Sequence, residues 1–235
     1  MLTLLLTACR TPEIQPLVPG PMPWADGEQS VYAVTDINGN YAGTTTITLN
    51  AGAATVEGDA WTLRREVATQ GDQEVVVIEA TAQGLRPLLS TLVRISGTVR
   101  QQVKATYTNG QVDMELTTAS DVTTYERRNI PSDARDQRSL MLLLRSLPLA
   151  QDYATQINSY LPVADLLERV TIVVEDQESV DVPAGRYTCW RVALRIDDSE
   201  SQAWIAVEDP HLLVKFVDDR NGGTFELRDY RATQE

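Results

Sequence analysis

The feature that most constrains the fold is a two-residue alternation of apolar and polar side chains, which runs through most of the chain after Glu28. In Arg186–Asp197, the even-numbered positions are mainly apolar, whereas the odd-numbered positions include two arginines and Cys189. Successive side chains of a strand point to opposite faces, so the pattern predicts a strand with one core face and one mixed face. Cys189 is placed on the mixed face, where the arginines would favour its thiolate. A free thiol without a role is the preferred interpretation, because no partner histidine is visible near it.

Turn residues separate these alternating segments and predict a mainly β chain. Asn-Gly pairs at Asn38-Gly39 and Asn109-Gly110 are typical of tight hairpins, because both residue types tolerate positive φ. Val182–Gly185, Asp197–Glu200 and Asp218–Gly223 also have turn composition. The predicted strands are Gln29–Asp36, Tyr41–Leu49, Thr55–Glu66, Gln73–Gln83, Leu89–Ser96, Thr98–Thr108, Gln111–Ser120, Val122–Arg128, Arg169–Glu178, Arg186–Asp197, Gln202–Glu208, His211–Asp219 and Thr224–Arg231.

Two helical segments interrupt the strands. In Arg138–Leu147, leucines recur at three-to-four spacing and Pro148 ends the run, so this helix should cover one face of a sheet. A weaker helical turn is predicted from Pro162 to Glu168. The polar segment Asn129–Gln137 could be a hinge between two halves. We predict one β domain over residues 27–235, because neither half would close its sheet edges alone.

The N-terminus resembles the end of a bacterial lipoprotein signal. Leu6-Thr7-Ala8-Cys9 matches each position of a lipobox, so residues 1–9 are interpreted as a remnant signal peptide. The resemblance implies a diacylglycerol on Cys9, palmitate incorporation and attachment to the cell or outer membrane, with the domain outside the cytoplasm; two or three acyl chains anchor a protein stably. The run lacks a basic start, which predicts an upstream translation start. A frayed end with a chance cysteine is the alternative.

Residues 10–26 are rich in proline: Pro12, Pro16, Pro19, Pro21 and Pro23 all lie before Trp24. Proline-rich segments favour an extended, semi-rigid conformation of about 3 Å per residue. We therefore expect a tether that holds the domain roughly 40 Å from the membrane.

Composition excludes several classes of function. The 33 acidic and 20 basic residues give a formal charge of −13, which would repel nucleic acid, and this acidity is interpreted as a solvated surface. Two cysteines and one histidine, His211, make neither a disulfide framework nor a zinc site. The sequence predicts no cofactor and leaves the oligomeric state open.

Candidate chemistry is also sparse. Asp36-Ile-Asn38-Gly-Asn40 begins like a calcium loop, but Tyr41 and Ile47 occupy the positions that require glycine and glutamate, so a hairpin turn is preferred. Asp218–Gly223 is likewise interpreted as an exposed turn. His211 has no accompanying nucleophile elbow. Glu175, Asp176 and Glu178 are interpreted as a strand end before a turn. No catalytic or metal-binding residue is predicted, and the chain is not expected to be an enzyme.

Several motifs together resemble domain-of-unknown-function family 3108, a group of exported bacterial proteins. They are Gly27-Glu28-Gln-Ser-Val-Tyr32 with the following Asn-Gly and Ala42-Gly43-Thr44, then Leu144-Arg145-Ser-Leu147-Pro148-Leu149, Val182-Pro183-Ala184-Gly185-Arg186-Tyr187, Ala203-Trp204-Ile205 and Asp209-Pro210. The resemblance implies a strongly curved antiparallel sheet, a half-barrel or open barrel similar to lipoprotein carriers and lipid-binding lipoproteins, with one or two short covering helices. It implies no activity.

Three functions remain open from the sequence. The first is a non-catalytic, membrane-anchored domain whose curved sheet binds an apolar ligand, such as an acyl chain, or docks an envelope partner. The second is an interaction module without a cavity, which a filled core beneath Arg138–Leu147 would favour. The third is a carbohydrate-active hydrolase, which would need a cleft with two carboxylates about 5–10 Å apart.

Overall fold

The computed structural model describes residues 12–56, 58–69, 71–220 and 222–233. Most of them lie in strands, as the alternation predicts. The strands are β1 (Ile14–Gln15), β2 (Glu28–Thr35), β3 (Tyr41–Ala51), β4 (Ala60–Thr69), β5 (Asp72–Thr81), β6 (Pro87–Ser96), β7 (Val99–Thr108), β8 (Gln111–Thr117), β9 (Thr123–Asn129), β10 (Arg135–Asp136), β11 (Ala154–Leu161), β12 (Leu166–Val182), β13 (Gly185–Ile196), β14 (Ser199–Ala206), β15 (Leu213–Asp218) and β16 (Gly223–Arg231).

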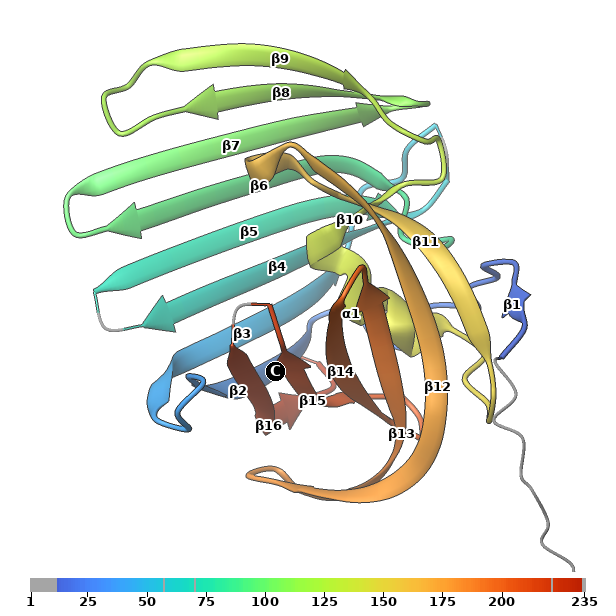
Figure 1. Cartoon of the computed structure of the whole chain (residues 1–235). Coiled ribbons are helices and arrows are strands. Elements are labelled where there is room, and N and C mark those ends of the chain that lie inside the picture. The colour runs from blue at the N-terminus through green and yellow to red at the C-terminus, as the bar shows by residue number, and fades with distance from the viewer. Residues whose placement is uncertain (1–11, 57, 70, 221, 234–235) are drawn as a thin grey trace, which may run out of the picture.

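These strands form one sheet in which β1 and β10 pair in parallel with β11 and the other neighbours are antiparallel. The chain makes two meanders, β2 to β9 and β11 to β16. They join where β16 pairs with β2, so the last strand lies beside the first long one. Figure 1 shows the result: the sheet curls until β11 to β14 lie opposite the β4 to β7 region, with α1 between them. The prediction of a mainly β, strongly curved antiparallel sheet is confirmed.

The two ends of the curled sheet meet through side chains rather than through a ladder of backbone hydrogen bonds. The hydroxyl oxygen of Tyr160 on β11 lies 3.1 Å from Met114 Sδ on β8 and donates its hydrogen bond to Asp165 at 2.8 Å. Arg128 on β9 donates to Asp165 at 2.6 Å. Register shifts at several positions, such as that between Val174 and Asp176, add bends to the strands. The sheet is therefore open in its backbone pairing, with β9 at one edge.

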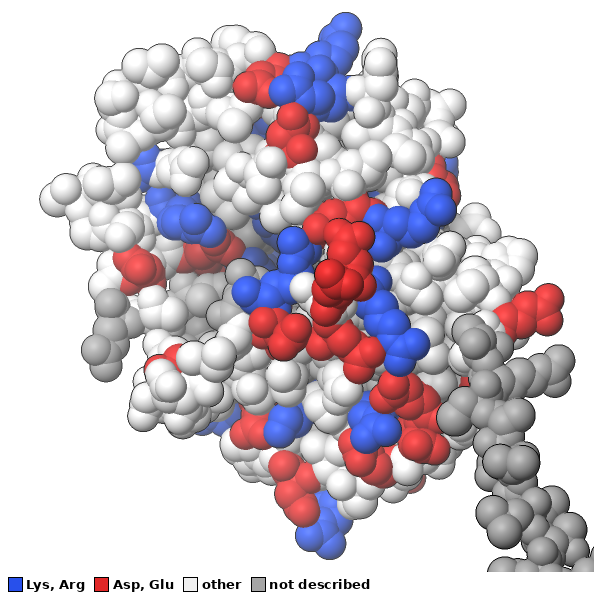
Figure 2. Space-filling view, viewed as in Figure 1, with Lys and Arg blue, Asp and Glu red and all other residues white. Residues whose placement is uncertain are grey.

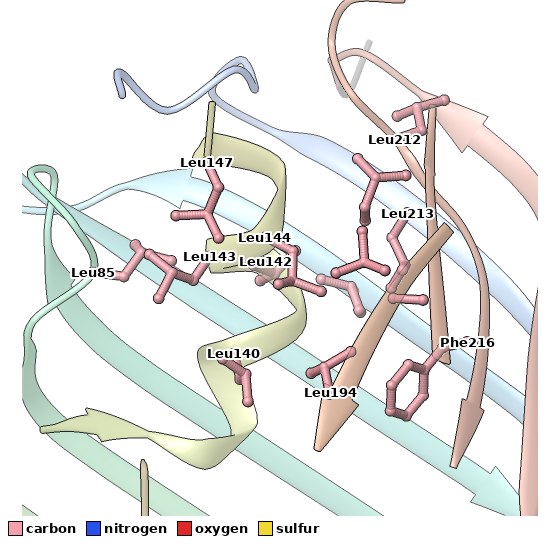
Figure 3. Close-up of a cluster of buried hydrophobic side chains, with 14 of the residues drawn as sticks. Leu85, Leu140, Leu142, Leu143, Leu144, Leu147, Leu194, Leu212, Leu213 and Phe216 are labelled. Carbon is pink, nitrogen blue, oxygen red and sulfur yellow. The ribbon is translucent and has the colours of Figure 1, made fainter. Parts of the chain in front are cut away.

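A short helical segment fills part of the concavity. It consists of a 3-10 turn (Gln137–Ser139), helix α1 (Leu140–Leu143) and a second 3-10 turn (Leu144–Ser146), here called the covering segment. Its leucines are at most 6% exposed. Figure 3 shows them between Leu85 on one side and residues of the second meander, including Leu194, Leu213 and Phe216, on the other. The predicted helix is thus confirmed in position, but only four of its residues are α-helical.

The second predicted helix is wrong in extent, because only Pro162–Ala164 form a 3-10 turn. Asp165 has a left-handed φ of 48° and ends it, and β12 begins at Leu166. Strand β11 was not predicted at all. Two of its buried positions, Thr155 and Ser159, are polar, which hides the alternation of apolar residues. Thr155 bonds instead to the carbonyl oxygen of Gln15 at 2.9 Å.

The proline-rich segment lies against the domain from Ile14 onward, contrary to the expectation of an extended tether over residues 10–26. Strand β1 pairs with β11. Gly20 donates its N–H to the carbonyl oxygen of Ser146 at 2.6 Å, and Trp24 is 5% exposed within the core. Apolar side chains between the prolines, such as Leu17 and Met22, pack on the main core cluster. Burial of these side chains therefore outweighs the preference of proline for a solvated, extended chain.

Candidate functional site

The concave face of the sheet encloses a cavity of about 590 Å³. This volume lies in the range of about 300–1,000 Å³ that small-molecule sites occupy. The covering segment borders it on one side and strands of both meanders border the rest. Most lining residues are apolar: Val34, Val67, Leu92, Leu140, Met141, Leu161, Val163, Leu166, Leu194, Ile196, Phe216 and Phe225.

Four arginines and two carboxylates interrupt this apolar lining. The arginines, here called the cavity arginines, are Arg65, Arg94, Arg138 and Arg220, and the carboxylates are Glu74 and Asp218. Figure 2 shows basic and acidic side chains lying together on this face of the molecule, beside a recess. The cavity therefore combines an apolar wall with a charged region.

Glu74 on β5 is shared between two cavity arginines. It lies opposite Arg94 across the β5–β6 pair, and Arg94 donates to Oε2 at 2.6 and 3.1 Å. Arg65 on β4 donates to Oε1 at 2.7 Å. Burial alone would raise the pKa of Glu74, but Arg65, Arg94 and Arg138 together lower it. A carboxyl held ionised in this way is poorly suited to act as a general acid.

Exposure distinguishes the deep from the outer cavity arginines. The side chains of Arg94 and Arg220 are 49% and 35% exposed, and each has a carboxylate partner: Glu74 for Arg94 and Glu168, at 2.7 Å, for Arg220. The side chain of Arg65 is only 22% exposed. Burial lowers the pKa of Arg65, Glu74 opposes this effect, and the positive charge of Arg138 adds to it.

The two deeper arginines have guanidinium nitrogens without a partner. Within the described part of the chain, Arg65 Nε and Arg138 Nη2 are buried and make no hydrogen bond. The guanidinium of Arg138 makes one hydrogen bond there, from Nη1 to Ser90 Oγ, and it is long at 3.4 Å. Buried donors of this kind are rare in native proteins and indicate a strained or functional place.

Arg145 is buried, and each of its guanidinium nitrogens donates a hydrogen bond. Nη1 donates to Glu28 at 2.6 Å, and Nε and Nη2 donate to the backbone carbonyl oxygens of His211 and Pro210 at 3.0 Å. The guanidinium also lies 5.2 Å from the centre of the Trp24 ring, and the ion pair is at most 2% exposed. We call Arg145 and Glu28 the buried pair; it joins the covering segment to strand β2 and to the Pro210 turn.

The expected placement of Cys189 on a mixed face that favours its thiolate is wrong. Its side chain is fully buried in the main core cluster, and burial, together with the negative charge of Glu178, raises the pKa of the thiol to about 12. The strand buries Cys189 from the odd positions near its start, and residues of both faces, Val192, Ala193 and Leu194, later. A single alternation read over the whole strand therefore assigns Cys189 to the wrong environment.

The other residues singled out from the sequence have structural places. Cys9 lies outside the described residues. Asp36 accepts hydrogen bonds from the backbone N–H groups of Asn38 and Asn40 at 2.9 Å, as in a hairpin turn, and only Gly39 of that turn has positive φ. Glu175 and its neighbours lie within β12 at a bulge, not at a strand end, and Glu175 pairs with Arg191 at 2.9 Å.

The cavity arginines were missed by sequence reasoning, although one signal could have found them. On β4 the inward positions are Leu63, Arg65 and Val67, and on β5 they include Glu74. Opposite charges at inward positions of consecutive strands break the apolar pattern of a core face. Alternation could not predict that Arg65 and Glu74 line the same cavity as Arg138, because Arg138 lies far from both in the sequence.

A family model described as a protein of unknown function, DUF3108, matches residues 31–228. The chain belongs to the DUF3108 family. The predicted resemblance is thereby confirmed. No curated protein matches the sequence significantly.

Among solved structures, a crystal structure of a β-barrel-like protein of domain of unknown function DUF1849 from Brucella abortus has a TM-score of 0.60. It is 14% identical, and the match covers 93% of this chain and 99% of that one, which shows a common fold alone. Two further matches have TM-scores too low to support a common fold. One is classed as a lipoprotein from Parabacteroides distasonis (0.31; 14% identity; 92% and 100% covered), and the other as an exported protein with a YmcC-like fold from Bacteroides fragilis (0.30; 9%; 91% and 99%).

The motifs that resemble DUF3108 have clear structural roles in this member. The Gly27-Glu28 and Leu144-Arg145 motifs supply the two halves of the buried pair. Gly43, with a φ of 154°, lies so close to strand β4 that an added Cβ would be 2.1 Å from the carbonyl oxygen of Ala68. In the Val182–Gly185 turn, Ala184 donates its N–H to the carbonyl oxygen of Leu227. These motifs therefore hold the curl of the sheet and do not line the cavity.

None of the helices in the described ranges is long and apolar enough to cross a membrane.

Proposed function

We propose that this DUF3108 protein is a non-catalytic binding domain of the bacterial cell envelope, which holds an apolar ligand in the cavity beneath its curved sheet. The observation that carries the proposal is the cavity itself, about 590 Å³ lined mainly by aliphatic and phenylalanine side chains. An apolar ligand that enters removes both its own surface and that of the lining from water.

The geometry favours this function over the two alternatives. A filled core beneath the covering segment would favour an interaction module, whereas part of that segment, including Leu140 and Met141, borders the cavity. A hydrolase would need a carboxyl able to donate a proton, but the arginines around Glu74 lower its pKa.

Cavity filling tests the proposal. Val67 on β4 lines the cavity and Ala68, the next residue, is exposed. We expect Val67→Trp to reduce binding of radiolabelled hexadecanol at least tenfold, because the indole would occupy the ligand volume, and Ala68→Trp to bind as the wild type does. Native mass spectrometry of detergent-free protein would also detect a ligand that co-purifies.

Circular dichroism and urea unfolding would show that both variants are folded. The proposal fails if folded wild-type protein neither binds hexadecanol nor carries any apolar ligand. Equal binding by the two tryptophan variants would place the ligand elsewhere.

We also propose that the domain is attached to the membrane through a lipid on Cys9, with the domain outside the cytoplasm. The support is the resemblance of Leu6-Thr7-Ala8-Cys9 to a lipobox. In cells that express the gene from its own locus, labelled palmitate should enter the wild type and Cys189→Ala, the matched control, but not Cys9→Ala. Equal labelling of Cys9→Ala would refute the anchor.

A further inference from the structure

The charged region of the cavity indicates which kind of apolar ligand fits. The lining holds four arginines and two carboxylates, and a third carboxylate, Glu168, pairs with Arg220 beside it. Arginines are therefore concentrated at this site although the whole protein carries a formal charge of −13.

The cavity arginines differ in their carboxylate partners. Arg94 and Arg65 share the single carboxylate of Glu74, while Arg220 is paired with Glu168. Arg138 has no carboxylate within ion-pair distance among the described residues, and buried Asp136 nearby accepts hydrogen bonds from Tyr107 and from the backbone of Arg138 instead. One guanidinium is therefore left without a full counter-charge beside the cavity.

The unpartnered donors lie on the two deeper arginines. Arg65 Nε and Arg138 Nη2 are both buried and lack a hydrogen-bond acceptor, and both residues line the cavity. Arg138 also repels Arg65 electrostatically. An anionic group placed at both guanidinium groups would supply the missing acceptors and relieve the repulsion, because arginine binds carboxylate and phosphate oxygens through charge-assisted hydrogen bonds.

We propose that the ligand is a single-chain anionic amphiphile, whose anionic head binds Arg65 and Arg138 and whose hydrocarbon chain lies along the apolar lining of the cavity. This proposal rests on the proposed function and specifies its ligand class. A carboxylate and a phosphate head share the required chemistry. The leucines and phenylalanines that face the same space would contact the chain, and the paired Arg94 and Arg220 would lie nearer the solvent.

The test compares ligands that share a hexadecyl-length chain and differ in the head: palmitate, hexadecyl phosphate and uncharged hexadecanol. Binding is measured at about pH 8 with the full chain carrying Cys9→Ala, so that the protein is not itself acylated. We expect the better of the two anions to bind roughly 10- to 100-fold more tightly than hexadecanol, since hydrogen bonds to charged groups are worth that much. The preferred anion distinguishes a fatty acid from a phosphate ester.

Variants then assign the preference to the two arginines. Arg65→Met and Arg138→Met keep much of the apolar bulk of the side chain and should each reduce anion affinity about tenfold or more without weakening hexadecanol binding. Arg186→Met is the matched control, because Arg186 lies on the exposed β12–β13 hairpin and pairs with Asp181. It should change neither affinity.

The outcomes separate this proposal from the proposed function. Equal affinities of wild-type protein for the anions and hexadecanol would overturn the head-group proposal and leave an apolar binding site. An anion preference that survives in both Arg65→Met and Arg138→Met would also overturn the head-group proposal. Absence of binding by all three ligands would overturn both proposals. Anion preference lost in Arg65→Met or Arg138→Met, with hexadecanol binding kept, would support both.

Discussion

Two groups of arginines in this protein have buried guanidinium nitrogens but differ in how many of those nitrogens have partners. In the buried pair, Arg145 donates to Glu28 and two backbone carbonyl oxygens and lies against the Trp24 ring, so each guanidinium nitrogen has a partner. In the cavity, Arg65 and Arg138 each retain a buried nitrogen without an acceptor. Both groups hold guanidinium nitrogens away from bulk water, but only in Arg145 does each of these nitrogens have an acceptor.

The difference separates the buried charges that stabilise the fold from those that we propose bind a ligand. A buried charge whose hydrogen bonds are all made within the chain stabilises one arrangement, and loss of either partner leaves the other charge uncompensated. A buried donor that lacks an acceptor beside a cavity stabilises little by itself. Such a donor gains an acceptor only when a ligand binds in the cavity. The comparison therefore predicts different consequences for similar substitutions.

The largest effect is expected for the buried pair. Arg145→Met should lower the free energy of unfolding by about 3–5 kcal/mol, because Glu28 would remain buried without its counter-charge. Urea unfolding would measure the loss. The double variant Glu28→Gln/Arg145→Met should lose less, since no charge is then stranded. A change below about 1 kcal/mol in Arg145→Met would show that the pair does not hold the fold.

An intermediate effect is expected from Tyr32, whose neighbours include Arg145. Burial raises the pKa of Tyr32 to about 12, against an ordinary value near 10. Above about pH 10 the unfolded chain loses this proton first, so stability should fall as pH rises towards 12, by about 2–3 kcal/mol in total from this residue. Tyr32→Phe should show a correspondingly smaller fall in urea unfolding, whereas exposed Tyr125→Phe should match the wild type.

The smallest effect is expected in the cavity. Arg138→Met in ligand-free protein should change the free energy of unfolding by less than about 1 kcal/mol, because its guanidinium makes one long hydrogen bond to Ser90. The measurement is the same urea unfolding used for Arg145→Met. A loss comparable to that of Arg145→Met would mean that Arg138 is part of the structural framework, and the contrast between the two groups would disappear.

Much of the fold was accessible from local pattern. Alternation located the strands of both meanders, and leucine spacing placed the covering segment, because strand and helix periods depend only on neighbouring residues. Strand β11 was missed where Thr155 and Ser159 occupy buried positions. The lining arginines were missed for a similar reason: Arg65 lies at an inward position of β4, but its neighbour across the cavity, Arg138, is distant in sequence.

What the sequence alone determined is the mainly β architecture, the hairpins marked by Gly39 and Gly110, the membership of DUF3108 and the hypothesis of a lipid on Cys9. All depend on short stretches whose conformation or recognition is set locally. Only the tertiary structure decided that β16 pairs with β2, that the proline-rich segment packs on the domain, and that Cys189 is buried and protonated. It also decided which buried charges find partners, because the curl of the sheet brings together side chains that are far apart in the sequence, such as Glu28 and Arg145, which are 117 residues apart.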